Sequence, residues 1–262
     1  MPSSVTPLSN VTPPSNATRP SNVTPPPLID VRDLQFQYED GTAALQGVTF
    51  RLEAGETVAL LGANGSGKTT FVLHLNGLLS GKGRVEVCGL AVEPRNLAAI
   101  RRKIGLVFQD SESQLFMPTV LEDVAFGPLN HGLSPHDAIH RATAALERVG
   151  MSAAADKAPY HLSAGEKKRV AIAGILAMDP EILILDEPTT FLDPIGQRAL
   201  AELLANLPQA KILVTHDIPF ARAICTRAVF FQNGTIAAAG SVEELVTRFG
   251  WDFALEPAKS KP

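Results

Sequence analysis

The residues best suited to chemistry occupy positions 62–69, which read GANGSGKT. This run fits the pattern G-x-x-x-x-G-K-[ST] of a phosphate-binding loop, in which small residues let backbone N–H groups turn toward phosphate oxygens. In such a loop Lys68 reaches the β- and γ-phosphates, and the Thr69 hydroxyl is placed to hold Mg²⁺. The residues predicted to line the phosphate site are Gly62, Ala63, Asn64, Gly65, Ser66, Gly67, Lys68, Thr69 and Thr70.

The segments on either side of the loop have the pattern that a phosphate site needs. Residues 57–61 (TVALL) form a short apolar run typical of a buried parallel strand. Residues 69–79 (TTFVLHLNGLL) follow with helical spacing, so bound phosphates would lie at a helix N-terminus. The alternative, a glycine-rich turn without a ligand, does not need this strand–loop–helix order.

A second group of polar residues is expected at the ends of buried strands. Residues 182–187 (ILILDE) are a continuous apolar run that ends in Asp186 and Glu187, and both can be ordinary strand-end acids. With a phosphate loop upstream, Asp186 is a candidate Mg²⁺ ligand and Glu187 a candidate base for the water that attacks the γ-phosphate.

Two further strand ends carry candidate site residues. Gln109 follows residues 104–108 (IGLVF), and His216 follows residues 211–215 (KILVT), which are expected to form the last core strand. Open α/β sheets place their functional residues at the carboxyl ends of the strands. His216 is therefore a candidate contact of the γ-phosphate, although a lone histidine is more often structural.

The remaining elements frame these residues. Residues 28–38 and 44–52 alternate apolar and polar residues as half-buried strands do, and residues 83–91 resemble them. Tyr38 ends the first strand; it can stack on adenine or simply be a strand-end aromatic. Residues 97–102 predict a short helix.

A helical subdomain is predicted for about residues 110–178, because this segment shows helical periods and few strand runs. Its most informative stretch is LSAGEKKRVAIA at 162–173. Ser163 is a good helix N-cap, and Glu166 lies three residues on as its capping-box partner.

Composition limits the remaining possibilities. The 262 residues carry 19% charged side chains and a net charge of −4, so no basic field indicates nucleic acid as a partner. Cys88 and Cys225 have neither metal-site nor disulfide-framework spacing, which suits a reducing compartment. The longest apolar run, residues 170–178, is far shorter than the roughly 20 residues of a membrane span. Any membrane association is expected to come through a partner.

The two ends of the chain are expected to lie outside the folded domain, which the sequence predicts over residues 28–244. Residues 1–27 contain an approximate six-residue repeat rich in Pro, Ser, Thr and Asn, and predict a disordered tail. The N-x-T triplets at Asn10, Asn16 and Asn22 are interpreted as products of that repeat. Residues 245–262 are expected to form a short helix and a C-terminal tail.

Taken together, these motifs resemble the nucleotide-binding subunit of an ABC transporter over roughly residues 28–244. Several motifs stand in the family's order: the phosphate loop, a Q-loop at Gln109, an LSGGQ-like signature at Ser163, Ala164, Gly165 and Glu166, a Walker B run ending at Asp186 and Glu187, a D-loop at Asp193 and a switch histidine at His216. The resemblance implies a P-loop NTPase fold of class α/β, with a RecA-like core, an antiparallel β subdomain and a helical subdomain. It also implies ATP and Mg²⁺ as cofactors, with Thr69, Gln109 and Asp186 toward the metal, and it makes Tyr38 an adenine contact.

Within that family, residues 107–116 (VFQDSESQLF), 118–133 and 162–178 resemble the ATPases of energy-coupling-factor transporters, most of all the cobalt/nickel type. This resemblance implies that two ATPase subunits close head to tail around two ATP molecules, each bound between one phosphate loop and the other subunit's signature. It further implies a transmembrane scaffold, docked near residues 109–133, and a membrane subunit that captures the substrate. The expected location is the cytoplasmic face of the cell membrane.

Two residues depart from the family pattern. Ala164 replaces a glycine, and its Cβ would crowd the facing phosphate, and so slow hydrolysis, if the backbone there had positive φ. Phe191 stands in the D-loop where a small residue is usual, which would alter packing between subunits.

Three alternatives remain beside a metal importer. A vitamin-type energy-coupling-factor ATPase shares all the motifs. A soluble ABC ATPase acting on DNA or ribosomes is disfavoured because the chain has one cassette and no sustained heptads. A regulatory subunit without hydrolysis is disfavoured because Lys68, Asp186, Glu187 and His216 are all present. The sequence leaves open the transported solute and whether the ATPase pair is homotypic or heterotypic.

Overall fold

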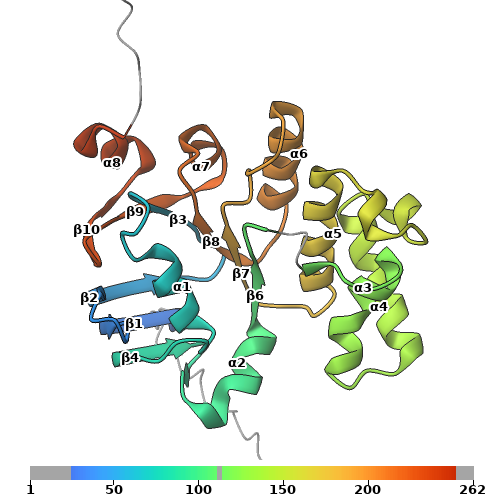
Figure 1. The fold of residues 1–262 in the computed structure, drawn as a ribbon, viewed down its shortest axis with the longest axis horizontal. Helices are drawn as coiled ribbons and strands as arrows, with labels where there is room; N and C mark the ends of the chain where they lie inside the picture. The colour runs from blue at the N-terminus through green and yellow to red at the C-terminus, as the bar shows by residue number, and fades with distance from the viewer. Residues whose placement is uncertain (1–24, 111–113, 252–262) are drawn as a thin grey trace, which may run out of the picture.

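The structure is a computed structural model that describes residues 25–110 and 114–251. The chain folds into two β-sheets with helices packed between and around them (Figure 1). The predictions for residues 1–24 and 252–262, including the three N-x-T triplets, lie outside the described residues.

The smaller sheet is antiparallel and has the order β2-β1-β4-β5. Its strands are β1 (Ile29–Gln37), β2 (Ala43–Leu52), β4 (Lys82–Val87) and β5 (Leu90–Ala91). The alternating residues of β1 and β2 bury one face, as the period-two pattern predicted. This sheet is the predicted antiparallel β subdomain.

The larger sheet has the order β10-β9-β3-β8-β7-β6 and is parallel except for its edge strand β10. Its strands are β3 (Thr57–Leu61), β6 (Ile104–Val107), β7 (Ile182–Asp186), β8 (Ala210–Val214), β9 (Arg227–Gln232) and β10 (Thr235–Gly240). Because parallel strands end at the same edge, the residues after β3, β6, β7 and β8 meet there. This sheet confirms the α/β core of a P-loop NTPase.

The prediction that residues 211–215 form the last core strand is wrong. β9 pairs with β3 in parallel, and β10 continues the sheet after a tight turn. Asn233 and Gly234 form that turn with φ of 48° and 74°, as an Asn-Gly hairpin requires. The apolar RAVFF run followed by Asn-Gly was the sequence signal for this hairpin.

Helix α1 (Lys68–Leu75) lies between the two sheets and joins them into one core (Figure 1). Its Phe71, Val72 and Leu75 are fully buried in a cluster that contains residues of both sheets. The helix ends at Leu75, four residues earlier than predicted, because Gly77 turns the chain with φ of 67°.

The helical subdomain packs against the opposite face of the larger sheet. It consists of α3 (Val120–Asn130), α4 (Pro135–Arg148) and α5 (Ala164–Leu176), and α2 (Leu97–Lys103) precedes β6. Along β7, Ile182 and Ile184 face the α1 side while Leu183 and Leu185 face the helices. The helical core is therefore continuous with the core of the sheet, and α5 contacts β6 directly at Gly105, where a Cβ would lie 1.9 Å from Ile175.

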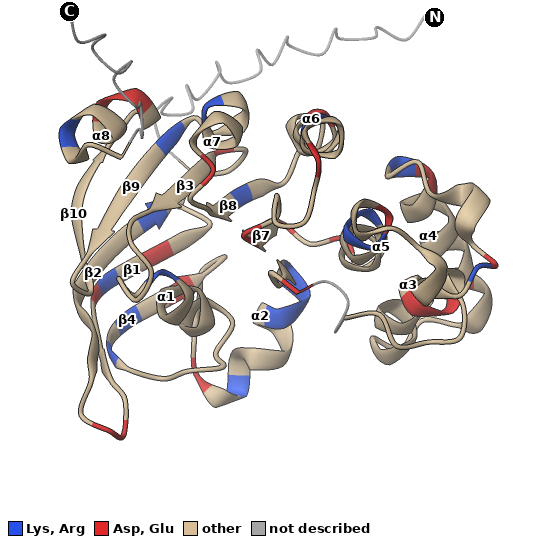
Figure 2. Cartoon of the chain, turned by 45° about the horizontal axis from the view of Figure 1, so that its top comes forward, with Lys and Arg blue, Asp and Glu red and all other residues tan. Residues whose placement is uncertain are grey.

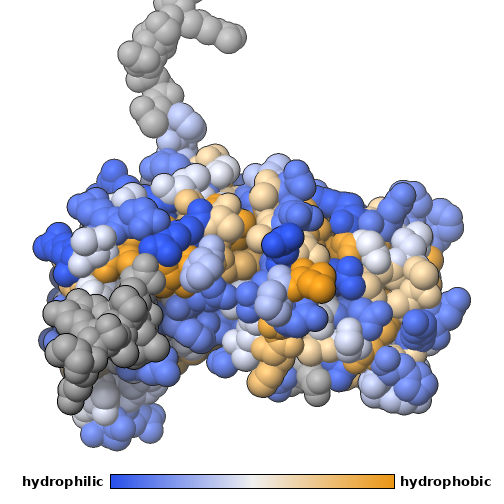
Figure 3. All heavy atoms as spheres, turned by 90° about the horizontal axis from the view of Figure 1, so that it is seen from above, coloured by the Kyte–Doolittle hydropathy of each residue, from blue (hydrophilic) through white to orange (hydrophobic). Residues whose placement is uncertain are grey.

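Three more helices cover the rest of this face of the larger sheet, over β8, β3 and β9. They are α6 (Pro194–Ala205), α7 (Ile218–Ile224) and α8 (Val242–Phe249). The domain end predicted after residue 244 falls inside α8, whose Leu245 and Val246 are buried and whose Phe249 stacks on Phe230 at 3.8 Å. Residues 245–251 thus pack on the core. Seen from above, the face that carries these helices mixes polar surface with separate apolar areas (Figure 3).

Across the described ranges, 25–110 and 114–251, every helix is too short or too polar to span a bilayer.

Candidate nucleotide-binding site

The phosphate loop connects β3 to α1, as predicted, and its glycines are required by its shape. Gly62 and Gly67 have φ of 132° and 107°. A Cβ on Gly62 would lie 2.2 Å from the Phe231 carbonyl oxygen, and one on Gly67 would lie 2.6 Å from the Ala44 carbonyl oxygen. Any larger residue at either position would have to displace backbone.

Lys68 is held inside this loop. Its ammonium donates to the carbonyl oxygens of Gly62 at 2.7 Å and Ala63 at 2.9 Å. Burial lowers the pKa of Lys68, and the Glu187 and Asp186 carboxylates act in the opposite direction. The Lys68 ammonium is therefore a partly desolvated cation held by the loop, where it can bind phosphate strongly.

Thr69 and Asp186 bring two oxygen ligands together beside the loop. The Thr69 hydroxyl donates to Asp186 Oδ2 at 3.3 Å. Burial, and then the neighbouring Glu187 charge, raises the pKa of Asp186. Hydroxyl and carboxylate oxygens are the donors that Mg²⁺ prefers, and a cation here would also relieve the buried charge, so the residues fit this metal.

Glu187 and His216 form the second pair at the strand ends. Glu187 has φ of 46°, an unusual backbone for a glutamate, and its N–H donates to the Val214 carbonyl oxygen at 2.8 Å. This turn directs its carboxylate toward His216, with Oε2 2.9 Å from Nδ1. The Glu187 side chain is 11% exposed and that of His216 is 70% exposed. A nearly buried acid thus contacts an exposed imidazole.

These groups line one cleft of about 550 Å³. Tyr38 and Gln109 lie at its margin, and the Tyr38 hydroxyl is 2.9 Å from Thr70 Oγ1. Figure 2 shows the acidic end of β7 near the centre of the molecule. The complete lining is Tyr38, Thr42, Ala43, Ala44, Asn64, Gly65, Gly67, Lys68, Thr69, Thr70, Gln109, Asp186, Glu187, Val214 and His216.

The signature residues Ser163–Glu166 are not part of this cleft. They begin α5 with the predicted capping box: Glu166 N–H donates to Ser163 Oγ at 3.4 Å, and Ser163 N–H donates to Glu166 Oε2 at 2.9 Å. Ala164 has helical backbone, so the positive φ on which its expected crowding depended is absent. With Asp193, the N-cap of α6, these residues line a separate hollow of about 460 Å³.

Lys168 contacts a cleft residue, Gln109, and the sequence analysis missed it. It is 3% exposed, and its ammonium donates to the Gln109 carbonyl oxygen at 2.9 Å. Burial lowers the pKa of Lys168, and the Asp110 and Asp186 carboxylates partly oppose this shift. The signal was available, because Lys168 lies on the same helical face as Ile172 and Ile175, where an apolar residue is expected.

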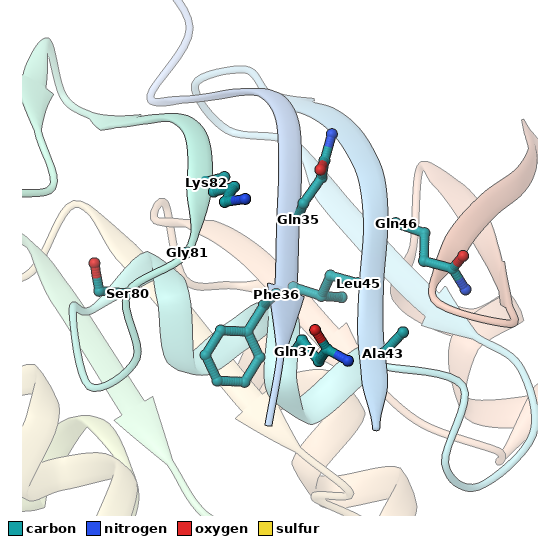
Figure 4. Close-up of a pocket in the computed structure, with 9 residues that line it drawn as sticks. All are labelled: Gln35, Phe36, Gln37, Ala43, Leu45, Gln46, Ser80, Gly81 and Lys82. Atoms are coloured by element: carbon teal, nitrogen blue, oxygen red, sulfur yellow. The ribbon is translucent and has the colours of Figure 1, made fainter. Parts of the chain in front are cut away.

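Another hollow, of about 660 Å³, lies on the antiparallel sheet (Figure 4). It meets the nucleotide cleft at Ala43, and Lys82 is the one ionisable residue of its lining. Glutamine side chains, including Gln35 and Gln37 of β1, supply most of its other polar groups. It contains no acid or base pair like that of the cleft.

Comparison with known proteins agrees with this arrangement. Residues 45–190 match the ABC transporter family. The chain is 53% identical over 221 residues to a putative ABC transporter ATP-binding protein of Streptomyces avermitilis, covering 84% of both chains. It is 46% identical over 226 residues to the energy-coupling factor transporter ATP-binding protein EcfA of Methanosphaera stadtmanae, covering 84% of this chain and 81% of the relative.

Solved structures give the same picture. The structure of cbiO1 from Clostridium perfringens, part of the ABC transporter complex cbiONQ, superposes with a TM-score of 0.77 and 37% identity, over 86% of this chain and 92% of that one. A dimeric bacterial ABC transporter cassette superposes with a TM-score of 0.72 and 30% identity, over 82% and 98% of the two chains. With this cleft, this fold and these relatives, the chain belongs to the ABC transporter family as an ATP-binding subunit.

Proposed function

We propose that the chain is the ATP-hydrolysing subunit of an energy-coupling-factor importer and that it powers uptake of a transition-metal ion, cobalt or nickel. One observation carries the ATPase part of the proposal: a single cleft collects the phosphate loop, Asp186, Glu187 and His216, while the Ser163–Glu166 turn lies outside it. The two halves of an ATP site thus lie on different surfaces of one chain. They can meet only when two subunits pair, so this arrangement suits ATP-driven pairing. The metal-ion part rests on the resemblance of residues 107–116, 118–133 and 162–178 to the cobalt/nickel type.

The binding roles follow from the cleft's geometry. The loop glycines and the α1 N-terminus hold the phosphates, with Lys68 as the neutralising charge. Thr69 and Asp186 hold Mg²⁺, and Gln109 reaches the same cleft from the end of β6. Bound Mg²⁺ supplies charge neutralisation at the β- and γ-phosphates. Tyr38 offers its ring to adenine beside Thr70.

Glu187 acts as the base in the hydrolytic step. Its carboxylate accepts the proton of the attacking water, and His216 holds that carboxylate through the 2.9 Å contact and faces the γ-phosphate. The fixed backbone at Glu187 keeps its oxygen in place before the reaction begins.

The second half of the site comes from another ATPase subunit. The Ser163 turn begins α5, and a helix N-terminus is favourable for an anion such as the γ-phosphate of ATP bound by the other subunit. Binding of two ATP molecules would thus close the pair, and hydrolysis would release it.

A membrane scaffold docks beside the helical subdomain, near residues 109–133. This region carries a groove of about 340 Å³ between α3 and α5, lined by Phe116, Phe126 and Met178 among others. Phe116 and Phe126 are exposed and meet edge to face at 5.0 Å. An apolar rim of this kind suits a helix from a membrane partner. The chain would then lie on the cytoplasmic face of the membrane.

Co-purification tests the proposal. The chain is tagged at its C-terminus, native membranes are extracted in mild detergent, and the recovered partners are identified. The expected result is a transmembrane scaffold together with a metal-capture subunit, and metal uptake that is lost in a Lys68→Ala variant that still assembles. Recovery of a vitamin-binding subunit in the complex would show that the transported substrate is a vitamin and would contradict the metal assignment. Recovery from the soluble fraction alone would contradict an importer.

A further inference from the structure

His74 is a buried polar residue of α1 that does not line the nucleotide cleft. It is 2% exposed, and its Nδ1 lies 2.7 Å from the Thr70 carbonyl oxygen, one helical turn earlier. Because a carbonyl oxygen only accepts hydrogen bonds, Nδ1 carries the proton and donates it to Thr70. Burial lowers the pKa of His74, so the imidazole is neutral at physiological pH.

The other ring nitrogen of His74 is buried at a cost. Nε2 has no hydrogen-bond partner within residues 25–110 and 114–251. The segment that precedes β4 closes over it, because a Cβ on Gly81 would lie only 3.2 Å from Nε2. An unpaired buried nitrogen lowers stability, and a leucine would fill this space without that loss. The stability of the core therefore does not account for an imidazole at this position.

The His74 ring has an aromatic neighbour that leads to the nucleotide cleft. The Phe36 ring on β1 meets the His74 ring edge to face, with centroids 4.7 Å apart, and meets the Tyr38 ring edge to face at 4.9 Å. The Tyr38 hydroxyl returns to α1 through its 2.9 Å contact with Thr70 Oγ1. Figure 4 shows the Phe36 ring on the side of β1 that faces the segment leading into β4. Tyr38, Phe36, His74 and Thr70 thus form a closed ring of contacts between β1 and α1.

We propose that His74 is a positioning residue for the adenine end of the cleft. The bond from Nδ1 to Thr70 fixes the plane of the imidazole, the imidazole holds Phe36, and Phe36 holds the Tyr38 ring in the orientation in which adenine stacks on it. Tyr38 needs such support, because it is 40% exposed and lies just beyond the end of β1. This inference rests on the adenine contact of Tyr38 in the proposed function. It concerns the base alone, because the phosphate loop and Lys68 bind the phosphates.

Isothermal titration of the full chain with Mg-ADP and with Mg-pyrophosphate tests this role. Both ligands bring two phosphates to the loop, only ADP brings adenine, and neither has a γ-phosphate that could be hydrolysed. His74→Leu removes the imidazole, whereas His74→Phe keeps an aromatic ring against Phe36. Phe36→Leu breaks the same path without changing α1. Val72→Ala is the matched control, because it opens a fully buried position on the same helix. Melting curves without ligand compare the stability of the variants.

The expected result is a dissociation constant for Mg-ADP that is about fivefold larger in His74→Leu and Phe36→Leu, with an unchanged constant for Mg-pyrophosphate. His74→Phe should keep Mg-ADP binding within about twofold of the parent, since the aromatic contact remains. His74→Leu should melt no lower than the parent, because the unpaired nitrogen is removed. Val72→Ala should melt below the parent but keep the parental ratio of the two dissociation constants.

Four outcomes would overturn the inference. If Tyr38→Ala changes the ratio of the two constants but His74→Leu and Phe36→Leu do not, His74 does not position Tyr38, and the proposed adenine contact stands. If Tyr38→Ala leaves the ratio unchanged as well, the adenine contact and the inference both fail. Equal losses for Mg-ADP and Mg-pyrophosphate in His74→Leu would show that His74 supports α1 as a whole. A His74→Leu chain that does not fold would show that the imidazole serves the core.

Discussion

The Lys168 ammonium donates to the Gln109 carbonyl oxygen at 2.9 Å, and this bond joins the signature helix α5 to the segment that follows β6. Lys168 is almost fully buried, whereas Gln109 is exposed at the margin of the nucleotide cleft. The position of the signature is therefore linked to a residue that lines the nucleotide cleft of the same subunit. A movement of α5 on pairing would be transmitted to Gln109.

We predict that Lys168→Met lowers kcat for ATP by roughly tenfold and leaves the KM nearly unchanged. Lys168 does not line the cleft, so ATP binding persists, but Gln109 loses the bond that fixes its backbone. Steady-state ATPase kinetics of the assembled complex measure both constants. Lys82→Met removes an exposed lysine from the antiparallel sheet and serves as the control. A KM that rises with an unchanged kcat would show that Lys168 acts in binding.

Tyr38 offers a prediction that separates its ring from its hydroxyl. Tyr38→Ala is expected to weaken ATP binding roughly tenfold, because a stacked base contributes about 1–3 kcal/mol. Tyr38→Phe keeps the ring and loses only the contact with Thr70 Oγ1, so its effect should be much smaller. Isothermal titration with ATP measures the two dissociation constants. Equal losses in the two variants would argue against stacking.

Asp186 makes stability depend on pH in a direction opposite to that of most carboxylates. Burial raises the folded-state pKa of Asp186 above the ordinary value of 3.8. The stability that the protonated Asp186 contributes is therefore fully present below pH 3.8 and is lost as the pH rises through the folded-state pKa. Asp186→Asn should therefore melt above the parent at pH 7.5 without Mg²⁺, and the difference should shrink as the pH approaches 4.

Asp137→Asn is the control for this measurement. A hydrogen bond with Ser134 lowers the pKa of Asp137, so its stabilising contribution is present at pH 7.5 and is lost as pH falls. This variant should melt below the parent at pH 7.5. Melting curves for Asp186→Asn that fall below the parent at pH 7.5 would contradict the account of Asp186.

The sequence predicted which strand-end residues meet in the cleft, because these residues follow buried parallel strands. The apolar runs before Gln109, Glu187 and His216 indicated parallel strands, and the common edge of such strands brings their ends together. The β9–β10 hairpin was missed, although Asn233-Gly234 marks it, and so one side of the core sheet was absent from the prediction.

Other features depend on tertiary contacts that no local pattern contains. The buried bond of Lys168 requires the packing of α5 against β6, and the strain at Phe191 and Glu187 requires the turns after β7. The helical backbone of Ala164, by contrast, follows from the local capping box of Ser163 and Glu166, which the sequence did contain, and it removes the expected conflict at Ala164.

The central claim is that Glu187 activates the attacking water in a site completed by a second subunit. The most direct measurement compares Glu187→Gln with the parent in the assembled complex, recording both ATP turnover and ATP-dependent pairing. We predict that turnover falls at least about a hundredfold while ATP binding is kept and the ATP-bound pair accumulates. Hydrolysis at the parental rate would show that Glu187 is not the base and would contradict the account.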